Sequence, residues 1–233
     1  FAAMMAAHFE GRVSHFITLN EPQIVLKLGY ADGIHAPGKR LSLPELVSCW
    51  KNLMLAHGLS FRAIRKAAPE ALIGIASTGK LCYPHSPADE DAARQETFRL
   101  TDSDWMFTHA IVLDAVCLGR DEPEAGALRK LLSEVTPEEW DTMHAVPDFI
   151  GVNSYNGSEI AAGPDGAPVY LPRPQGFART ALKWPITPEI MEHGYAFLFD
   201  RYRLPLYVTE CGLSCNDHIY LDGTVHDLSL IHI

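Results

Sequence analysis

The sequence Phe16-Ile-Thr-Leu-Asn-Glu-Pro22 is a short apolar run that ends in an amide, a carboxylate and a proline. Two later segments follow a similar plan, Phe149-Ile-Gly-Val-Asn-Ser-Tyr155 and Leu206-Tyr-Val-Thr-Glu-Cys-Gly212. In an α/β fold, polar groups that directly follow a buried strand lie at the carboxyl edge of a parallel sheet, where active sites are built. The three segments therefore predict one polar site at one edge of one sheet.

Short apolar runs alternate with longer helical patterns along the chain. The apolar runs, rich in β-branched or aromatic residues, are Val13–Leu19, Leu72–Ala76, Asp148–Asn153 and Leu206–Thr209. Apolar residues at helical spacing predict helices over Leu43–Lys66 and Asp104–Leu118. Strands that alternate with helices imply βαβ units and a parallel sheet. The pattern alone fits either half of an eight-stranded barrel or a small doubly wound sheet.

Helix starts are marked by a hydroxyl residue followed by a proline and a carboxylate. This signal occurs three times, in Ser42-Leu-Pro-Glu45, Thr136-Pro-Glu-Glu139 and Thr187-Pro-Glu189. Residues 1–8 have the pattern of an amphipathic helix. We expect a capped helix after each hydroxyl residue.

Composition narrows the class of partner. The 233 residues carry 19 basic and 29 acidic side chains, a formal net charge of −10, and the acidic residues are scattered. We therefore expect neither a nucleic-acid partner nor binding to an anionic membrane surface. The five cysteines include no CxxC pair, which favours reduced thiols and a cytoplasmic location. No His/Cys cluster has metal-ligand spacing, so we expect no metal and no organic cofactor.

Two carboxyl groups that flank one bond are what the hydrolysis of a glycoside requires. One must be a protonated acid for the leaving oxygen, and the other an ionised nucleophile or base. Glu21 and Glu210 are both predicted at strand ends. A single glutamate in such a place more often caps an element or pairs with a cation, so the specificity lies in the combination of motifs.

That combination resembles glycoside hydrolase family 1, the β-glucosidase family. The segment Thr18-Leu-Asn-Glu-Pro22, with Leu28-Gly-Tyr30 and Gly33-Ile-His-Ala-Pro-Gly38 after it, resembles the family's acid/base segment. Tyr207-Val-Thr-Glu-Cys-Gly212 resembles its nucleophile segment, usually Thr-Glu-Asn-Gly, and Gly151-Val-Asn-Ser-Tyr155 is similar to its Asn-Tyr-Tyr strand. The order and spacing also agree, and the resemblance covers roughly residues 9 to 227.

The resemblance implies an α/β fold, the (β/α)8 TIM barrel, and retaining hydrolysis of terminal β-D-glucosides or short β-linked oligosaccharides by double displacement. Glu210 would attack the anomeric carbon, and Glu21 would protonate the leaving group and later deprotonate water. The carboxyl groups of retaining enzymes lie ~5–5.5 Å apart. The charge on Glu210 would keep Glu21 protonated until glycosylation removes that charge.

Further site residues carry over from the resemblance. Asn20 would bind the sugar 2-hydroxyl, and Asn153 and Tyr155 would complete the substrate site. Tyr155 would also hydrogen-bond Glu210 and keep it ionised. Trp184 resembles the platform against which the aglycone stacks, although a core tryptophan beside a helix start is an equally open interpretation.

The chain departs from the family pattern at several positions. Cys211 stands where asparagine is usual, and its weaker donor predicts reduced turnover. Ser154 replaces the first tyrosine of the Asn-Tyr-Tyr strand and should matter little, because it points away from Tyr155. Gln23, where tryptophan is common, predicts a more polar entrance to the site. His35 and His57 match family positions and are expected to be structural.

Relative to the family, we expect an incomplete barrel with about strands 4 to 7 and their helices. Residues 1–227 would form this partial barrel, and residues 228–233 would be a non-native tail. We expect such an internal fragment to be inactive by itself. Two alternatives stay open: a 6-phospho-β-glycosidase of the same family, and a non-catalytic sugar-binding remnant. The presence of both glutamates argues against the remnant.

Overall fold

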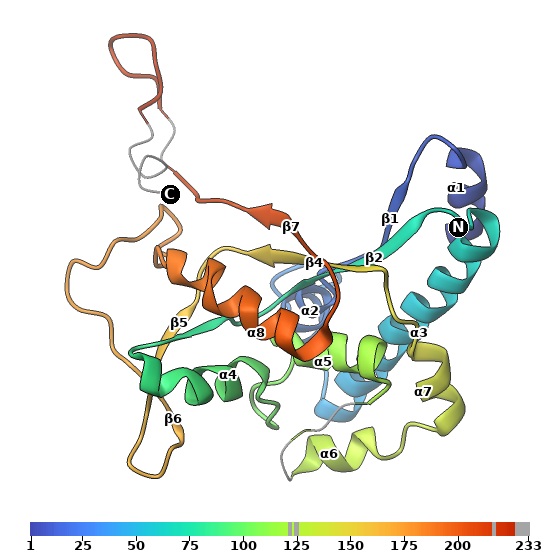
Figure 1. Ribbon diagram of the computed structural model, residues 1–233, viewed down its shortest axis with the longest axis horizontal. Helices are drawn as coiled ribbons and strands as arrows, with labels where there is room; N and C mark the ends of the chain where they lie inside the picture. Colours follow the sequence, from blue (N-terminus) through green and yellow to red (C-terminus); the bar gives the residue numbers. More distant parts are fainter. Residues whose placement is uncertain (121–122, 124–125, 216–217, 227–233) are drawn as a thin grey trace. The chain divides into compact units, whose positions relative to one another are not determined.

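A computed structural model describes residues 1–120, 123, 126–215 and 218–226, so the predicted tail at 228–233 lies outside the described residues. The chain forms two compact units, whose elements are labelled in Figure 1. Unit 1 consists of Phe1–Gly79, Phe98–Asn153 and Leu198–Thr209. Unit 2 consists of Lys80–Thr97, Ser154–Phe197 and the residues from Glu210 onward.

Unit 1 is built on a four-stranded sheet with the strand order β1-β2-β4-β7. Its strands are β1 (His15–Asn20), β2 (Leu72–Thr78), β4 (Phe149–Ser154) and β7 (Leu206–Cys211). The pairs β1–β2 and β2–β4 are parallel. The four predicted strands are thus confirmed. Neighbours in the sheet follow one another in the chain, without the reversal of order that defines a doubly wound sheet. This order is that of an arc of a (β/α)8 barrel.

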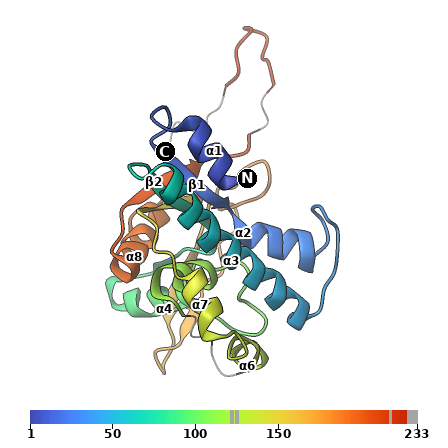
Figure 2. The same ribbon diagram turned by 90° about the vertical axis from the view of Figure 1, so that its right-hand side faces the viewer.

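Two helices of unit 1 begin at predicted capping signals. They are α1 (Ala2–Phe9), α2 (Pro22–Ile24), α3 (Leu43–Ala67), α5 (Ala110–Leu113), α6 (Ala127–Leu132) and α7 (Pro137–Met143), with π-helical turns at Val25–Ala31 and Asp114–Leu118. Capping boxes at Ser42 and Thr136 start α3 and α7. Both α1 and α7 pack against α3, and α1 lies beside α3 in both views (Figures 1 and 2).

The predicted helix over Asp104–Leu118 is wrong before Ala110, where regular helix begins. The Thr108 hydroxyl donates to the Trp105 carbonyl (2.8 Å) and accepts the N–H of Ile111 (3.3 Å). This side chain therefore forms a local turn that replaces the first helical hydrogen bonds. The helix ends at Gly119, whose φ of 68° lies in the left-handed region.

Unit 2 contains a second, smaller sheet that the sequence pattern did not reveal. Its strands are β3 (Cys82–Pro84), β5 (Ser158–Ala162) and β6 (Pro168–Tyr170), in the order β3-β5-β6. Figure 1 shows β5 and β6 as an antiparallel hairpin. The helical elements are α4 (Glu90–Phe98), α8 (His193–Tyr202, which runs on into unit 1) and two 3₁₀ turns, at Pro87–Asp89 and Pro188–Met191.

The third predicted helix start, at Thr187, gives only the short 3₁₀ turn Pro188–Met191. The Thr187 hydroxyl does not cap this turn, because it accepts the backbone N–H of Gly157 at 2.8 Å instead. The hydroxyl is therefore used to join two segments of unit 2.

A buried carboxylate also joins segments of this unit: Glu96 accepts from the Lys80 ammonium (2.6 Å) and the Tyr170 phenol (2.7 Å).

His57 is a buried structural residue of unit 1, as predicted. Its Nε2 lies 2.9 Å from the Ala145 carbonyl and its Nδ1 lies 2.7 Å from the Thr18 hydroxyl. The carbonyl can only accept, so Nε2 carries the proton and Nδ1 accepts from Thr18. Burial lowers the pKa of His57 from 6.5 to about 4. The ring therefore joins α3 to β1 as a neutral group.

This depressed pKa predicts a loss of stability in acid. Below pH 6.5 the unfolded chain takes up a proton at His57 that the folded chain refuses until about pH 4. The unfolding free energy should therefore decrease as the pH is lowered through this window. His57 contributes as much as about 1.4 kcal/mol per pH unit to this decrease. Urea unfolding at a series of pH values measures the slope. His57→Gln should reduce it, whereas the exposed His35→Gln should not, and equal slopes would contradict the prediction.

Candidate active site

Glu21 lies at the corner where β1 leaves the sheet. Its backbone is left-handed (φ 48°, ψ 55°), a conformation that is uncommon for a residue other than glycine. The Glu21 N–H still pairs with the Ala76 carbonyl of β2 at 2.9 Å, while its own carbonyl accepts the N–H of Ile24 at 2.9 Å. Such a conformation costs about 1–3 kcal/mol and persists only where its surroundings enforce it. The corner thus presents a carboxylate at the carboxyl edge of the sheet.

The side-chain amide of Asn153 holds this carboxylate. Its Nδ2 donates to Glu21 Oε1 (2.9 Å) and to Asn20 Oδ1 (3.2 Å). Its Oδ1 accepts from the Thr209 hydroxyl at 2.6 Å, which fixes which end of the amide faces the carboxylate. Asn153 is buried at the end of β4. The structure therefore brings together three of the predicted residues, Asn20, Glu21 and Asn153, in unit 1.

Gly151 allows this arrangement by its lack of a side chain. A Cβ atom at this position would lie 2.8 Å from Thr209 Cγ2 and 3.2 Å from the Ala76 Cα. Thr209 can therefore approach β4 closely only because residue 151 is glycine. Neither Thr209 nor Gly151 was predicted as a site residue. The available signal was their position, because each lies two residues or fewer from a predicted site residue on its own strand.

The other predicted residues gather in unit 2. The Tyr155 phenol donates a hydrogen bond to Glu210 Oε2, the contact that the sequence predicted. The ring centroids of Tyr155 and Trp184 are 5.6 Å apart, and the planes are tilted by 53°. Trp184 is 41% exposed, so it is not a core tryptophan. A carboxylate, a phenol and a flat aromatic face therefore lie close together in this unit.

A small cavity of about 50 Å³ adjoins the Tyr155 side of this group. Its lining is mostly apolar and consists of Ser154, Tyr155, Ile186, Thr187, Pro188, Ile190, Met191, Cys211, Gly212 and Leu213. The Ser154 hydroxyl lies 2.8 Å from the phenol oxygen of Tyr195, and burial raises the pKa of that phenol. The Cys211 side chain is exposed. Ser154 thus bonds to Tyr195 rather than to the Tyr155–Glu210 pair.

The prediction of a more polar entrance at Gln23 is wrong. The side chain of Gln23 is fully buried and hydrogen-bonds within unit 1, to Ser77 Oγ at 2.7 Å. The prediction failed because the burial of a residue after a strand depends on which segments pack against it, and sequence pattern does not show this. Gln23 supports the corner from inside.

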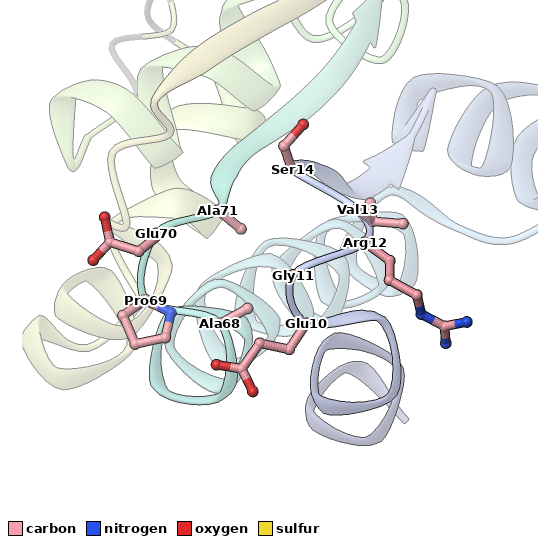
Figure 3. A pocket seen from close by; sticks show the side chains of 9 residues that line it. All are labelled: Glu10, Gly11, Arg12, Val13, Ser14, Ala68, Pro69, Glu70 and Ala71. Atoms are coloured by element: carbon pink, nitrogen blue, oxygen red, sulfur yellow. The ribbon is translucent and has the colours of Figure 1, made fainter.

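A larger hollow of about 320 Å³ lies at the opposite edge of the sheet, beside the residues that precede β1 and β2. Its lining includes Ala68, Pro69 and Ala71, and Figure 3 shows the charged ends of Arg12 and Glu70 pointing away in different directions. Binding sites need convergent polar groups. The carboxyl edge of the sheet is therefore the better candidate for chemistry.

Two features are absent from the described residues. No group of three or more His, Cys, Asp or Glu side chains in the described part of the chain is arranged to hold a metal ion. Within the same residues, no helix is long and apolar enough to cross a membrane.

The sequence profile of Glycosyl hydrolase family 1 matches residues 1–232, nearly the whole chain. The chain belongs to this family. Its fold is accordingly part of the family's barrel, as the strand order of unit 1 indicated.

Known β-glucosidases are similar to this chain along almost its whole length. Beta-glucosidase A of Thermotoga maritima is 28% identical over 99% of this chain and 51% of the relative, and Beta-glucosidase A of Acetivibrio thermocellus is 31% identical over 93% and 48%. The structure of the beta-glucosidase from Thermotoga maritima in complex with castanospermine superposes with a TM-score of 0.78 at 27% identity, over 98% of this chain and 50% of that one. The chain therefore spans about half the length of the relatives it matches.

The close approach of Thr209 to Gly151 leads to a prediction about stability. Gly151→Ala should destabilise the protein by about 1–3 kcal/mol, because the new methyl group must push apart packed strands. Thermal or urea unfolding measures the change. Gly212→Ala is the control, since a Cβ there meets nothing within 4 Å. Equal stability of the two variants would show that β4 and β7 are less closely packed than described.

Proposed function

We propose that the protein containing this chain is a retaining β-glycosidase that hydrolyses terminal β-D-glucosides, with Glu210 as nucleophile and Glu21 as acid/base. The observation that carries the proposal is that the two carboxylates have different donors. Glu210 receives a phenol hydrogen bond from Tyr155, and Glu21 receives an amide hydrogen bond from Asn153. Family membership and the similarity to β-glucosidases support the same reaction.

In this proposal the phenol of Tyr155 prepares Glu210 for attack. A hydrogen bond donated to an ionised carboxylate favours the charged form and fixes the direction of its oxygens. The nucleophile must be ionised when the sugar binds, because it forms a bond to the anomeric carbon as the leaving oxygen departs. Glycosylation converts the carboxylate into an ester, and water later releases the sugar.

Glu21 has to serve first as an acid and then as a base. The amide of Asn153 orients the carboxyl group, and because it carries no charge it favours the ionised form less than a neighbouring cation would. The proton of Glu21 passes to the leaving oxygen in the first step, and Glu21 takes a proton from water in the second. We infer that Asn153 positions Glu21, because both ends of its amide are engaged by protein groups.

Two further residues have roles in the proposal. Asn20 lies beside Glu21 on the same corner, where its amide would bind the sugar 2-hydroxyl. Trp184 offers a half-exposed ring near Tyr155 as a surface for the aglycone. The proposed substrate is then a small β-linked glucoside that needs both hydrogen-bonding groups and an aromatic surface.

The proposal applies to a protein that also has the other half of the barrel. The curated relatives are about twice as long as the matched segment. In TIM-barrel enzymes the active site is built at the carboxyl face of the complete barrel. We therefore propose that this chain alone does not hydrolyse glucosides, and that the full-length protein does. The experiments on activity below use the full-length protein.

The first test removes the nucleophile. Glu210→Gln should lower the hydrolysis of an aryl β-glucoside by a factor on the order of 10⁴ or more, because the glycosyl–enzyme ester cannot form. Binding of glucose, followed by calorimetry, should change little. Glu70→Gln, which changes an exposed carboxylate at the opposite edge of the sheet, should leave the rate unaltered.

The wild-type protein in the same assay separates the alternative functions. Hydrolysis of a 6-phospho-β-glucoside in preference to the free glucoside would favour the phosphoglycosidase. Binding of glucose without any hydrolysis would favour a non-catalytic remnant. Either result would replace the proposed substrate or reaction.

A second test concerns Cys211. An asparagine at this position would supply an amide donor beside the nucleophile in place of a weaker thiol. One additional hydrogen bond is worth about 0.5–1.5 kcal/mol, so Cys211→Asn should raise kcat roughly 2- to 10-fold. Cys49→Ser removes a thiol from α3 and serves as the control. An unchanged kcat in Cys211→Asn would show that the thiol does not limit turnover.

A further inference from the structure

The side chain of Gln23 stays attached to β2 after the backbone of β1 has left the sheet. Its Nε2 donates to Ser77 Oγ at 2.7 Å and to the Thr108 carbonyl at 3.2 Å. Its Oε1 lies 3.5 Å from the N–H of Thr78, which points toward it as a donor. A primary amide carries the same donor and acceptor as a peptide group. The Gln23 side chain therefore continues the β1–β2 ladder beyond Glu21, whose own N–H makes the preceding bond to Ala76.

A second buried side chain supports this contact. Nδ1 of His109 lies 3.0 Å from Ser77 Oγ, and both residues are fully buried. Burial lowers the pKa of His109 to about 3, so the ring is neutral. Ser77 Oγ accepts the Gln23 donor and forms its second hydrogen bond with Nδ1 of His109. The hydroxyl that receives the Gln23 amide is therefore also held from its other side.

These contacts lie on both sides of a strained residue. Before Glu21, β1 pairs with β2 through backbone hydrogen bonds. After Glu21, the chain passes through Pro22, whose ring fixes its φ, to the anchored Gln23. A left-handed glutamate would relax if one flank were released, because the conformation is unfavourable by itself. Relaxation would carry its carboxyl group away from the Asn153 amide.

We propose that Gln23 is a positioning residue for Glu21, which holds the acid/base carboxyl in place through Ser77, Thr78 and Thr108. The inference rests on the proposed function. Gln23 touches no reacting atom in this account, and it acts only through the backbone corner that it anchors. A primary amide is unfavourable to bury unless its hydrogen bonds are made. The bonds of the buried Gln23 amide therefore fix the position of the corner that carries Glu21.

The experiment compares two substrates that differ in their need for an acid. A dinitrophenyl β-glucoside releases a stable phenolate without protonation, whereas an alkyl β-glucoside requires a proton on the leaving oxygen. Gln23→Met keeps the length of the side chain and removes its hydrogen bonds. We expect kcat/KM of the full-length protein to fall roughly 10²-fold for the alkyl glucoside, the effect of a misplacement of about 1 Å. For the dinitrophenyl glucoside, kcat/KM reports the glycosylation step, and it should change little.

Two further variants control for a general loss of structure. Thr97→Val removes a buried hydroxyl that accepts the Cys82 N–H at 3.2 Å and donates to Ala93 at 2.9 Å, within unit 2. It should affect both substrates equally or not at all. Ser77→Ala removes one partner of Gln23 and should give a smaller loss with the same preference for the alkyl glucoside. If Gln23→Met does not fold, the Ser77→Ala variant alone tests the positioning role of Gln23.

The outcomes distinguish this inference from the proposed function. A wild-type protein that cleaves neither glucoside contradicts the proposed function. A wild-type protein that cleaves both, with variants at Gln23 and Ser77 that lose both activities equally or lose neither, overturns only the positioning role. A selective loss on the alkyl glucoside supports it.

Discussion

The polar edge of the sheet depends on the side chain of Asn153. Its amide joins the end of β4 to the ends of β1 and β7, through Glu21 and Thr209. The Asn153 carbonyl also accepts from the Thr78 hydroxyl of β2 at 3.2 Å. All four strands of unit 1 therefore meet at one residue. Because β2 lies between β1 and β4 in the sheet, the amide reaches across a neighbouring strand to hold the carboxylate.

This reach is possible because small residues lie where larger ones would block it. A Cβ on Gly74 would lie 2.4 Å from the ring of Phe149, just as a Cβ on Gly151 would collide with Thr209. The ring of Phe149 in turn stacks on Tyr207 with centroids 4.5 Å apart. Large and small residues thus alternate between neighbouring strands, as in the layers that fill a parallel barrel.

The strands could be predicted because apolar runs are a local property of the sequence. Their order was not fixed by the pattern, and it followed from the family resemblance, because chain order equals sheet order in an arc of a barrel. The pairing of Tyr155 with Glu210 was also predictable from the family resemblance. The burial of Gln23 was not, because its partner Thr108 is distant in sequence. The strands of the second sheet are too short for a periodic pattern to appear.

The donors that hold the candidate acid/base carboxyl are uncharged. Two carboxylates elsewhere in unit 1 are held by cations: Asp114 accepts from Arg201 at 2.6 Å, and Asp148 from Arg65 at 2.5 Å. A cation beside a carboxyl group strongly favours its ionised form, which suits a structural ion pair. Glu21 is held by the neutral amide of Asn153, and its corner is anchored by the neutral amide of Gln23. A group that must give up a proton and recover it within one reaction cycle needs a fixed position with as little bias toward one charge state as possible. An amide supplies the position with less bias than an arginine, whose charge would oppose protonation of the carboxylate.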